Sequence, residues 1–273
     1  MQRDETHLLP IWIVYHAALV GYRALTIVDH GSIEPACLET LRQAEALGVR
    51  VIRLSSETVP LTAKGEEIAA LIRGLDPATA AVFPLDADEF IGLRITDGTY
   101  SCDSSAIAAG MDQLPAGMAF STAERLNNCP WDPHTYWPMP PDRSPKIFFS
   151  TTNVVGLDLG FHRCDQPGPL VASDFVLFHY HNKPHPMLRE HTLRKLLPRL
   201  ALPTSPCLEA YRGPGEHLLA GLLQGERRWL EQLRRQPSRY TPALAQRLAQ
   251  LGQPLPFAAH HGRLRALLAP LSP

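Results

Sequence analysis

The chain has 273 residues, 45% of them hydrophobic, which allows one large domain or a domain of about 200 residues with an appendage. Its 26 basic and 27 acidic residues leave a net charge of −1, which excludes a general electrostatic attraction to nucleic acid or anionic lipid. The five cysteines include no Cys-x-x-Cys pair, so a disulfide framework or a zinc knuckle is not expected. Because no apolar run approaches the ~20 residues of a membrane span and the first residues are too polar for a signal peptide, we expect a soluble, cytoplasmic protein.

The first hundred residues alternate helix-like and strand-like segments, the pattern of an α/β fold with a mainly parallel sheet flanked by helices. The expected helices are 8–19, 36–47 and 64–75, and the expected strands are 24–28, 49–54 and 80–85. Gly21 and Gly48 end the first two helices. The third strand leads into Asp86-Ala87-Asp88-Glu89 at its C-terminal end, which is where ligands bind in open α/β sheets.

The pattern loosens after Gly92. Further strands are expected at 118–122, 146–150 and 175–180, with a long ordered loop at 127–143. The later part is helical, with helices expected at 187–200, 217–235, 242–251 and 262–268. Several prolines interrupt this region, so we expect one domain over 1–202 and a helical C-terminal extension over 203–273.

The strongest local motif is Asp86-Ala87-Asp88-Glu89. Two carboxylates one residue apart at a strand end can hold a hard divalent cation that keeps open positions for substrate phosphates. The alternative is that these acids only cap a loop and the turn after it.

Two weaker signals accompany this motif. Asp29 leaves an apolar strand into the turn His30-Gly31-Ser32, where an acid can accept hydrogen bonds from a base or ribose. His179 and His181 alternate along one expected strand and therefore share a face from which imidazole can reach a metal. An ordinary turn and a polar edge strand are the alternatives.

Taken in order, these features resemble the family-2-like glycosyltransferases of GT-A fold, in particular the group with an Asp-x-Asp-Glu-Phe motif. The similar segments are Arg3-Asp4-Glu5, residues 9–16, 27–32 and 85–91, Lys146-Ile147, Gly160-Phe161-His162, His179-Tyr180 and Arg194-Lys195. The resemblance covers roughly residues 3 to 200 and implies a GT-A-like, Rossmann-like domain over 1–202.

The resemblance implies transfer of a sugar, with inversion, from a nucleotide-diphosphate donor to a glycan or other hydroxyl acceptor, with Mg or Mn as cofactor. Asp29 would contact the nucleoside. Asp86 would lie near the ribose or the metal, and Asp88 would be a direct metal ligand. His162 or His179 would complete the metal or diphosphate site.

Three further residues take roles in this interpretation. Arg3 and Lys146 would contact the diphosphate. An Asp or Glu of the later half would deprotonate the acceptor hydroxyl, and we assign Asp158 to this role. The other candidates for the base are Glu124, Asp165 and Asp174.

The resemblance has one departure, because the strand that usually precedes the Arg-Asn-Glu segment has no counterpart before Arg3. A non-catalytic nucleotide-sugar-binding or scaffolding descendant of the fold is therefore one alternative. A metal-dependent hydrolase using Asp86, Asp88, His179 and His181 is another. The arginines of the C-terminal extension would allow peripheral membrane contact, through Arg227, Arg228, Arg234 and Arg235.

Overall fold

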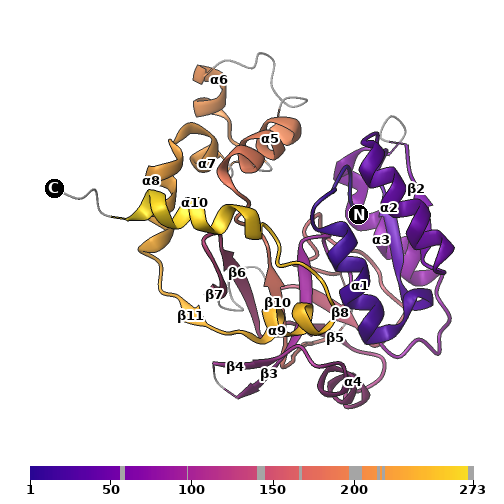
Figure 1. Cartoon of the computed structure of the whole chain (residues 1–273). Helices are drawn as coiled ribbons and strands as arrows, with labels where there is room; N and C mark the ends of the chain where they lie inside the picture. Colours follow the sequence, from indigo (N-terminus) through magenta and orange to yellow (C-terminus); the bar gives the residue numbers. More distant parts are fainter. Residues whose placement is uncertain are drawn as a thin grey trace.

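The computed structural model describes residues 1–55, 59–96, 98–139, 145–165, 168–196, 205–213, 216 and 219–269. Its N-terminal part alternates helices and strands (Figure 1). The elements are α1 (Leu9–Val20), η1 (Tyr22–Ala24), β1 (Thr26–Asp29), α2 (Pro35–Ala46), β2 (Arg50–Arg53), η2 (Leu61–Ala63) and α3 (Lys64–Arg73). The first three expected helices and first two expected strands are therefore confirmed, with ends shifted by a few residues. Gly21 ends α1 with φ of 82°, a conformation that other residues rarely adopt.

The middle of the chain builds two further sheets. Its elements are β3 (Glu89–Thr96), β4 (Thr99–Ser101), α4 (Ser104–Asp112), β5 (Ala119–Ser121), β6 (Glu124–Cys129), β7 (Asp132–Met139), β8 (Ile147–Phe149), β9 (Leu170–Ala172) and β10 (Phe175–His179). A three-stranded sheet has the order β8-β5-β9. A six-stranded sheet has the order β11-β7-β6-β10-β3-β4, where β11 is Arg239–Tyr240.

The fold is mixed α/β, and the expectation of a mainly parallel sheet is wrong. Within the described residues the pairs β1–β2, β5–β9 and β6–β10 are parallel, whereas β3–β4, β3–β10, β5–β8, β6–β7 and β7–β11 are antiparallel. The physical reason lies in the short connections. Only Pro130 and Trp131 separate β6 from β7, and two residues can join antiparallel strands but not parallel ones.

Two expectations for local structure are corrected. Residues 80–85 form no strand, since only Val82 makes a bridge, to Phe149, and Pro84 has no amide hydrogen to donate. The expected loop 127–143 is instead the β6–β7 hairpin as far as Met139, because Tyr136 and Trp137 are buried there despite the neighbouring prolines. Residues 140–144 of that segment lie outside the described residues.

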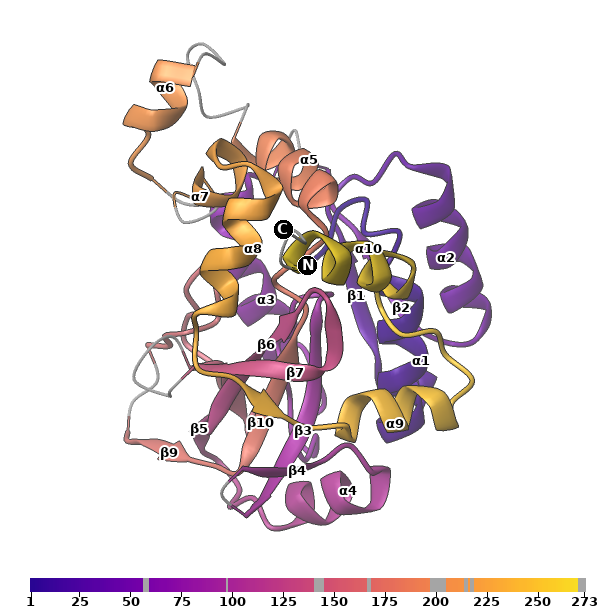
Figure 2. The ribbon, with the colours of Figure 1, turned by 60° about the vertical axis from the view of Figure 1, so that its left-hand side comes forward.

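The C-terminal part contains α5 (His185–Leu196), α6 (Ser205–Ala210), α7 (Leu219–Leu223), α8 (Glu226–Arg234), α9 (Ala243–Gln250) and α10 (Ala258–Leu268). The single helix expected at 217–235 is wrong, because Gly225, with φ −68° and ψ 150°, is extended and separates α7 from α8. Figures 1 and 2 both show α5 to α8 gathered at one end of the molecule, beyond β6 and β7. The expected domain boundary at residue 203 and the expected helix end at 200 lie outside the described residues.

The C-terminal segment also returns to the main body. β11 extends the six-stranded sheet by pairing with β7, and Leu244 and Leu248 of α9 join the largest hydrophobic cluster. That cluster includes Tyr15 of α1, whose hydroxyl donates to the Ile91 carbonyl oxygen at 2.5 Å. Helix α1 therefore holds β3 in place, and β3 begins at the candidate site.

The first residues lie beside β1. Gln2 forms a parallel bridge to Asp29, with its amide donating to Val28 at 2.9 Å and its carbonyl accepting from the His30 amide at 2.8 Å. The backbone groups of β1 that bind Gln2 alternate along the chain with the backbone groups that bind β2. Gln2 therefore lies at the edge of β1 opposite to β2.

Candidate functional site

One face of the six-stranded sheet carries a row of polar side chains across three adjacent strands. The pairing register sets Glu89 of β3 beside His179 of β10, and His179 beside Asn127 of β6. Arg125 lies two residues before Asn127 and therefore on the same face. The intervening side chains point to the other face and are fully buried: Phe90, Phe178 and Leu126.

Asp86 and Asp88 lie in the loop that enters β3. The Asp86 amide donates to the Glu89 carboxylate at 2.9 Å, and the Glu89 amide donates to the Asp86 carbonyl oxygen at 3.1 Å. The Tyr180 amide donates to the Asp88 carbonyl oxygen at 2.8 Å. These backbone contacts hold both aspartates at the end of the polar row.

Two lysines meet this row from distant parts of the chain. The Lys146 ammonium lies 2.8 Å from Asp86 Oδ2 and 2.9 Å from Glu89 Oε2, and Lys64 donates to Asp86 Oδ1. Both ammonium groups lie over the Phe161 ring, 4.3 Å (Lys64) and 4.7 Å (Lys146) from its centroid. The side chains of Lys146 and Glu89 are only 3% and 1% exposed, whereas Asp86 is 30% exposed, so the network is buried below and opens to solvent at Asp86.

A glycine sets the position of Lys64, the first residue of α3. A Cβ atom on Gly65 would lie 1.9 Å from the Leu157 carbonyl oxygen, which is far inside van der Waals contact. Only glycine therefore lets the start of α3 approach the chain at residue 157 closely enough for Lys64 to reach Asp86.

Burial and charge shift the titration of this network in opposite directions. Burial disfavours the charged form of Asp86, but Lys146 and Lys64 outweigh that effect and hold its pKa well below the usual range. Burial raises the pKa of Glu89, and Lys146 offsets only part of the rise. Burial likewise opposes the charge of Lys146, yet Asp86 and Glu89 raise its pKa. Lys146 is therefore a permanent cation.

Asp88 and His179 form a second pair, with 3.7 Å between Asp88 Oδ1 and His179 Nε2. The other ring nitrogen, Nδ1, lies 2.9 Å from Asn127 Oδ1, which accepts hydrogen bonds only, so Nδ1 carries the proton. Burial lowers the pKa of His179 to about 4, which leaves the ring neutral at pH 7. The Nε2 lone pair thus faces a carboxylate oxygen, and two acceptors at this separation leave room for a cation between them.

Arg125 adds a guanidinium beside these acids. Burial lowers its pKa, while Glu89, Asp88 and Asp86 raise it in part. Within the described part of the chain its Nε atom is buried without a hydrogen-bond partner. A buried donor of this kind is costly unless something accepts its hydrogen bond, so Arg125 offers a binding contact.

The segment after β10 is fixed to β6 by a reciprocal amide pair. Asn182 donates its amide to Asn128 Oδ1 at 2.9 Å, and Asn128 Nδ2 donates to the Asn182 carbonyl oxygen at 3.0 Å. The next residue, Lys183, forms an ion pair with Glu5 at 2.5 Å. Burial alone would raise the pKa of Asp88, but the charges of His179 and then Lys183 outweigh it and lower that pKa.

The structure gives two residues of the expected donor site other surroundings. Asp29 is buried at the end of β1, where its Oδ1 accepts hydrogen bonds from Gln2 Nε2 at 2.7 Å and from the Ser32 hydroxyl. Arg3 is 45% exposed and lies 3.9 Å from Asp4. The contacts of Asp29 stabilise the turn after β1, and its expected contact with a nucleoside stays a prediction.

His162 and Asp158 lie together in the turn before residue 164, close to Lys146. Asp158 Oδ1 accepts from the amides of His162 at 2.5 Å and Arg163 at 3.1 Å. The His162 ring binds the Pro145 carbonyl oxygen through Nδ1 at 2.7 Å, and burial lowers its pKa. Of the two expected histidine ligands, the structure thus brings His179 to Asp88 and gives His162 a partner beside Lys146.

Four residues of the site were not assigned a role from the sequence: Lys64, Glu89, Arg125 and Asn127. One signal could have found the first, since lysine occurs at only four positions, 64, 146, 183 and 195. Glu89 closes the Asp86-Ala87-Asp88-Glu89 motif, although only the two aspartates were given a role. Long-range contacts place Arg125 and Asn127, and the sequence carries no local mark of them. Among the residues that the structure describes, no three His, Cys, Asp or Glu side chains form a metal-binding group, and no helix has the length and apolar character needed to cross a membrane.

Comparison of the chain with protein-family models, with curated proteins and with solved structures gives no match. The functional argument therefore depends on the geometry of the site.

Proposed function

We propose that the chain is a divalent-metal-dependent glycosyltransferase, which moves a sugar from a nucleotide-diphosphate donor to an acceptor hydroxyl with inversion. The observation that carries this proposal is the Asp88–His179 pair, with its two facing acceptor atoms 3.7 Å apart beside buried lysine and arginine cations. A cation fits between the pair, and an anionic diphosphate fits beside the cations. The order of motifs along residues 3 to 200 supports the same function.

The donor atoms present fit a metal in part. Asp88 and His179 supply one carboxylate oxygen and one neutral imidazole nitrogen, which would leave the remaining positions of Mg²⁺ or Mn²⁺ to phosphate oxygens and water. Asp86 does not fit the expected role of ligand as it stands, because both of its oxygens already bind ammonium groups. Such a metal would neutralise charge that develops on the departing nucleoside diphosphate.

The cations of the chain would complete the donor site. Lys64 and Arg125 border the open part of the network, and Arg125 has a buried donor with no partner among the described residues. Charge-assisted hydrogen bonds from guanidinium and ammonium groups to phosphate oxygens are short and strong. Asp158 remains our proposed base, and it would act through Oδ2 because Oδ1 already holds the turn.

Calorimetry with UDP and with GDP, each with and without Mn²⁺, tests the proposal. We expect nucleotide binding that needs the metal and that Asp88→Asn removes. Asp112→Asn is the matched control, because Asp112 is exposed at the end of α4. Absence of nucleotide binding, or binding that neither metal removal nor Asp88→Asn changes, would refute the proposal.

One observation favours a second function. Because Lys64 and Lys146 occupy the Asp86 carboxylate, a binding module without catalysis would keep the same buried network. Incubation with UDP-sugars and GDP-sugars separates the two functions. Release of nucleoside diphosphate in the presence of Mn²⁺, lost in Asp88→Asn, supports transfer. Metal-dependent binding with no release from any donor supports the binding module.

A further inference from the structure

A cavity of about 540 Å³ lies between α1, β1, α3 and residues 79–85. Aliphatic side chains form most of its wall, among them Leu19, Leu25, Ile68, Leu71, Ile72 and Leu75. Protein interiors leave few voids larger than a water molecule, whereas pockets for small molecules measure about 300–1,000 Å³. An apolar space of this size therefore indicates a ligand site.

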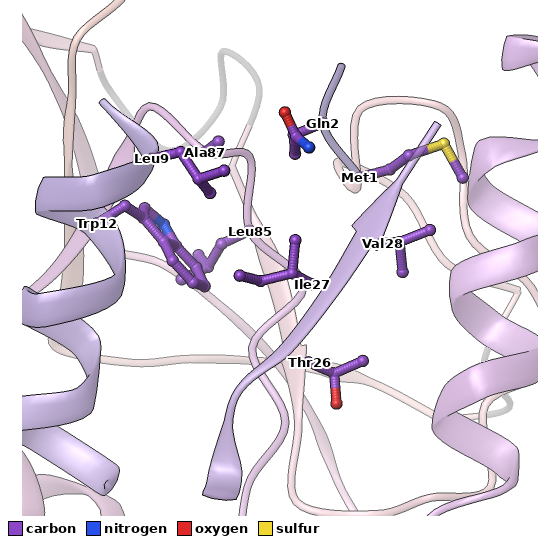
Figure 3. A pocket seen from close by; sticks show the side chains of 9 residues that line it. All are labelled: Met1, Gln2, Leu9, Trp12, Thr26, Ile27, Val28, Leu85 and Ala87. Atoms are coloured by element: carbon purple, nitrogen blue, oxygen red, sulfur yellow. The ribbon is translucent and has the colours of Figure 1, made fainter. Parts of the chain in front are cut away.

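The two faces of β1 meet different surroundings. Figure 3 draws a smaller pocket that shares Trp12, Thr26, Val28 and Leu85 with the cavity; there Ile27 points toward Trp12 and Leu85, and Thr26 and Val28 point away from them. The lining includes Leu25, just before β1, and Thr26 and Val28 of β1. On the other side it includes Ile68, Leu71 and Ile72 of α3, and Leu75 beyond the end of that helix. At about 3.3 Å per extended residue, the wall from Leu25 to Val28 is about 10 Å long. At about 1.5 Å per helical residue, the part of α3 from Ile68 to Ile72 covers about 6 Å of it. The space is elongated and suits a single alkyl chain.

One end of the cavity is polar and exposed. Arg23 and Arg50 line it there, just before β1 and at the start of β2, and both are exposed. Neither guanidinium forms an ion pair with a described residue, and Asp76 brings the single carboxylate of the lining. Phe161 and Ile72, which also line the cavity, are 0% and 3% exposed. The entrance therefore carries a net positive charge above an apolar interior.

We propose that this cavity binds a medium-length, single-chain anionic amphiphile, with its alkyl chain between β1 and α3 and its carboxylate beside Arg23 and Arg50. The aliphatic walls and their length select the chain. Arg23 and Arg50, which have no ion-pair partner among the described residues, select the charge, since guanidinium groups bind carboxylates with matching geometry. None of these contacts uses Asp86, Asp88 or His179, so the inference stands apart from the proposed function.

Calorimetry with decanoate, and with decan-1-ol as its uncharged counterpart, tests the inference. We expect saturable binding of one decanoate per chain. Leu71→Trp fills the interior and should weaken both ligands at least tenfold. The double variant Arg23→Gln/Arg50→Gln should weaken decanoate about tenfold and leave decanol unchanged. Arg42→Gln is the matched control, because Arg42 is exposed on α2 and away from the cavity.

Ala81→Leu, on the opposite wall, is a second variant that fills the cavity. It keeps the test valid if circular dichroism shows that Leu71→Trp does not fold. Lack of saturable decanoate binding by the folded wild-type chain would overturn the inference. Decanoate affinity that survives both filling variants would show that the ligand lies elsewhere. Affinity that the double arginine variant does not change would refute the anionic entrance.

Discussion

Replacing Lys146 by Met removes the cation from the most buried part of the charged network. The Lys146 ammonium lies between Asp86 and Glu89, at 2.8 and 2.9 Å, and its side chain is 3% exposed. Methionine has a similar length and no charge, so the variant changes electrostatics much more than packing. Glu89, 1% exposed, would then keep a carboxylate in the interior without its cation.

The expected cost is large. Removing one partner of a buried ion pair destabilises proteins by about 3–5 kcal/mol, because the remaining charge stays desolvated. With a urea m value of about 3 kcal/mol per molar, this loss corresponds to a midpoint lowered by about 1–2 M. Glu89→Gln in the same chain removes the stranded charge. The double variant Lys146→Met/Glu89→Gln should therefore be more stable than Lys146→Met alone.

The pH dependence gives an independent check. Burial already raises the pKa of Glu89, and loss of Lys146 raises it further, so the folded variant binds a proton more readily than the unfolded chain. A raised carboxyl pKa contributes stability that is present at low pH and is lost as the pH rises. The loss in the free energy of unfolding of Lys146→Met, relative to the wild type, should therefore be smaller at pH 5 than at pH 8.

The wild type, Lys146→Met, Glu89→Gln and the double variant form a double-mutant cycle. Urea unfolding of all four, followed by circular dichroism at pH 5 and pH 8, measures their free energies of unfolding. Coupling between the two sites should exceed about 1 kcal/mol, which is beyond the additivity error for independent sites. A loss below about 1 kcal/mol in Lys146→Met, additive effects of the two substitutions, or a deficit that grows at low pH would each refute the reasoning.

Two further predictions concern the scaffold. Burial lowers the pKa of His16 from 6.5 to about 3, so the neutral buried ring stabilises the fold above pH 6.5 and this stabilisation is lost as the pH falls. In urea unfolding, the free energy of unfolding of the wild type should decrease by about 2 kcal/mol between pH 8 and pH 5 through this residue, and His16→Gln should lack that decrease. Gly65→Ala should destabilise the fold by about 1–3 kcal/mol, because the added Cβ would lie 1.9 Å from the Leu157 carbonyl oxygen. Gly74→Ala is the control: its Cβ would lie 3.5 Å from the nearest atom, so the variant should be neutral or stabilising. Equal pH profiles for the His16 pair, or equal midpoints for the two alanine variants, would contradict these expectations.

The elements that the sequence predicted correctly are those with a strong local pattern. Helix α2 has apolar positions at helical spacing and a glycine after its end, and β10 is a continuous apolar run before His179. Such signals act within one segment and need no information about the rest of the chain. They explain why the alternating N-terminal part was predicted well.

The errors arise where a distant contact decides the local structure. Residues 80–85 are as apolar as a buried strand, yet Phe83 stacks on Phe148, with ring centroids 4.3 Å apart, and the backbone pairs only at Val82. Conversely, β7 contains two prolines and was expected as a loop, but β6 binds its backbone and buries Trp137. In both cases tertiary packing outweighs local propensity.

The candidate site shows the same division. Asp86 and Asp88 were predicted because they lie within one short motif. The partners of Asp86, Lys64 and Lys146, lie 22 and 60 residues away along the chain, and no spacing rule connects these positions. Asp29 lies in a local motif that suggested a ligand contact, and in the structure its carboxylate accepts hydrogen bonds from Gln2 and Ser32. The sequence therefore indicated candidate site residues that lie within one motif, but not the distant side chains that contact them.

The charges of the inner cluster balance without any ligand. Three carboxylates, Asp86, Asp88 and Glu89, face three cations, Lys64, Lys146 and Arg125. His179 and the Met1 amino group add no charge at pH 7, because burial lowers their pKa values to about 4 and about 5. A buried cluster near electrical balance resists a lone ion of either sign, because the added charge is neither hydrated nor paired. A divalent cation that enters with a nucleoside diphosphate adds little net charge. Under the proposed function, we therefore expect the metal and the nucleotide to bind jointly, each tightening the other, and linkage requires that the two enhancements be equal.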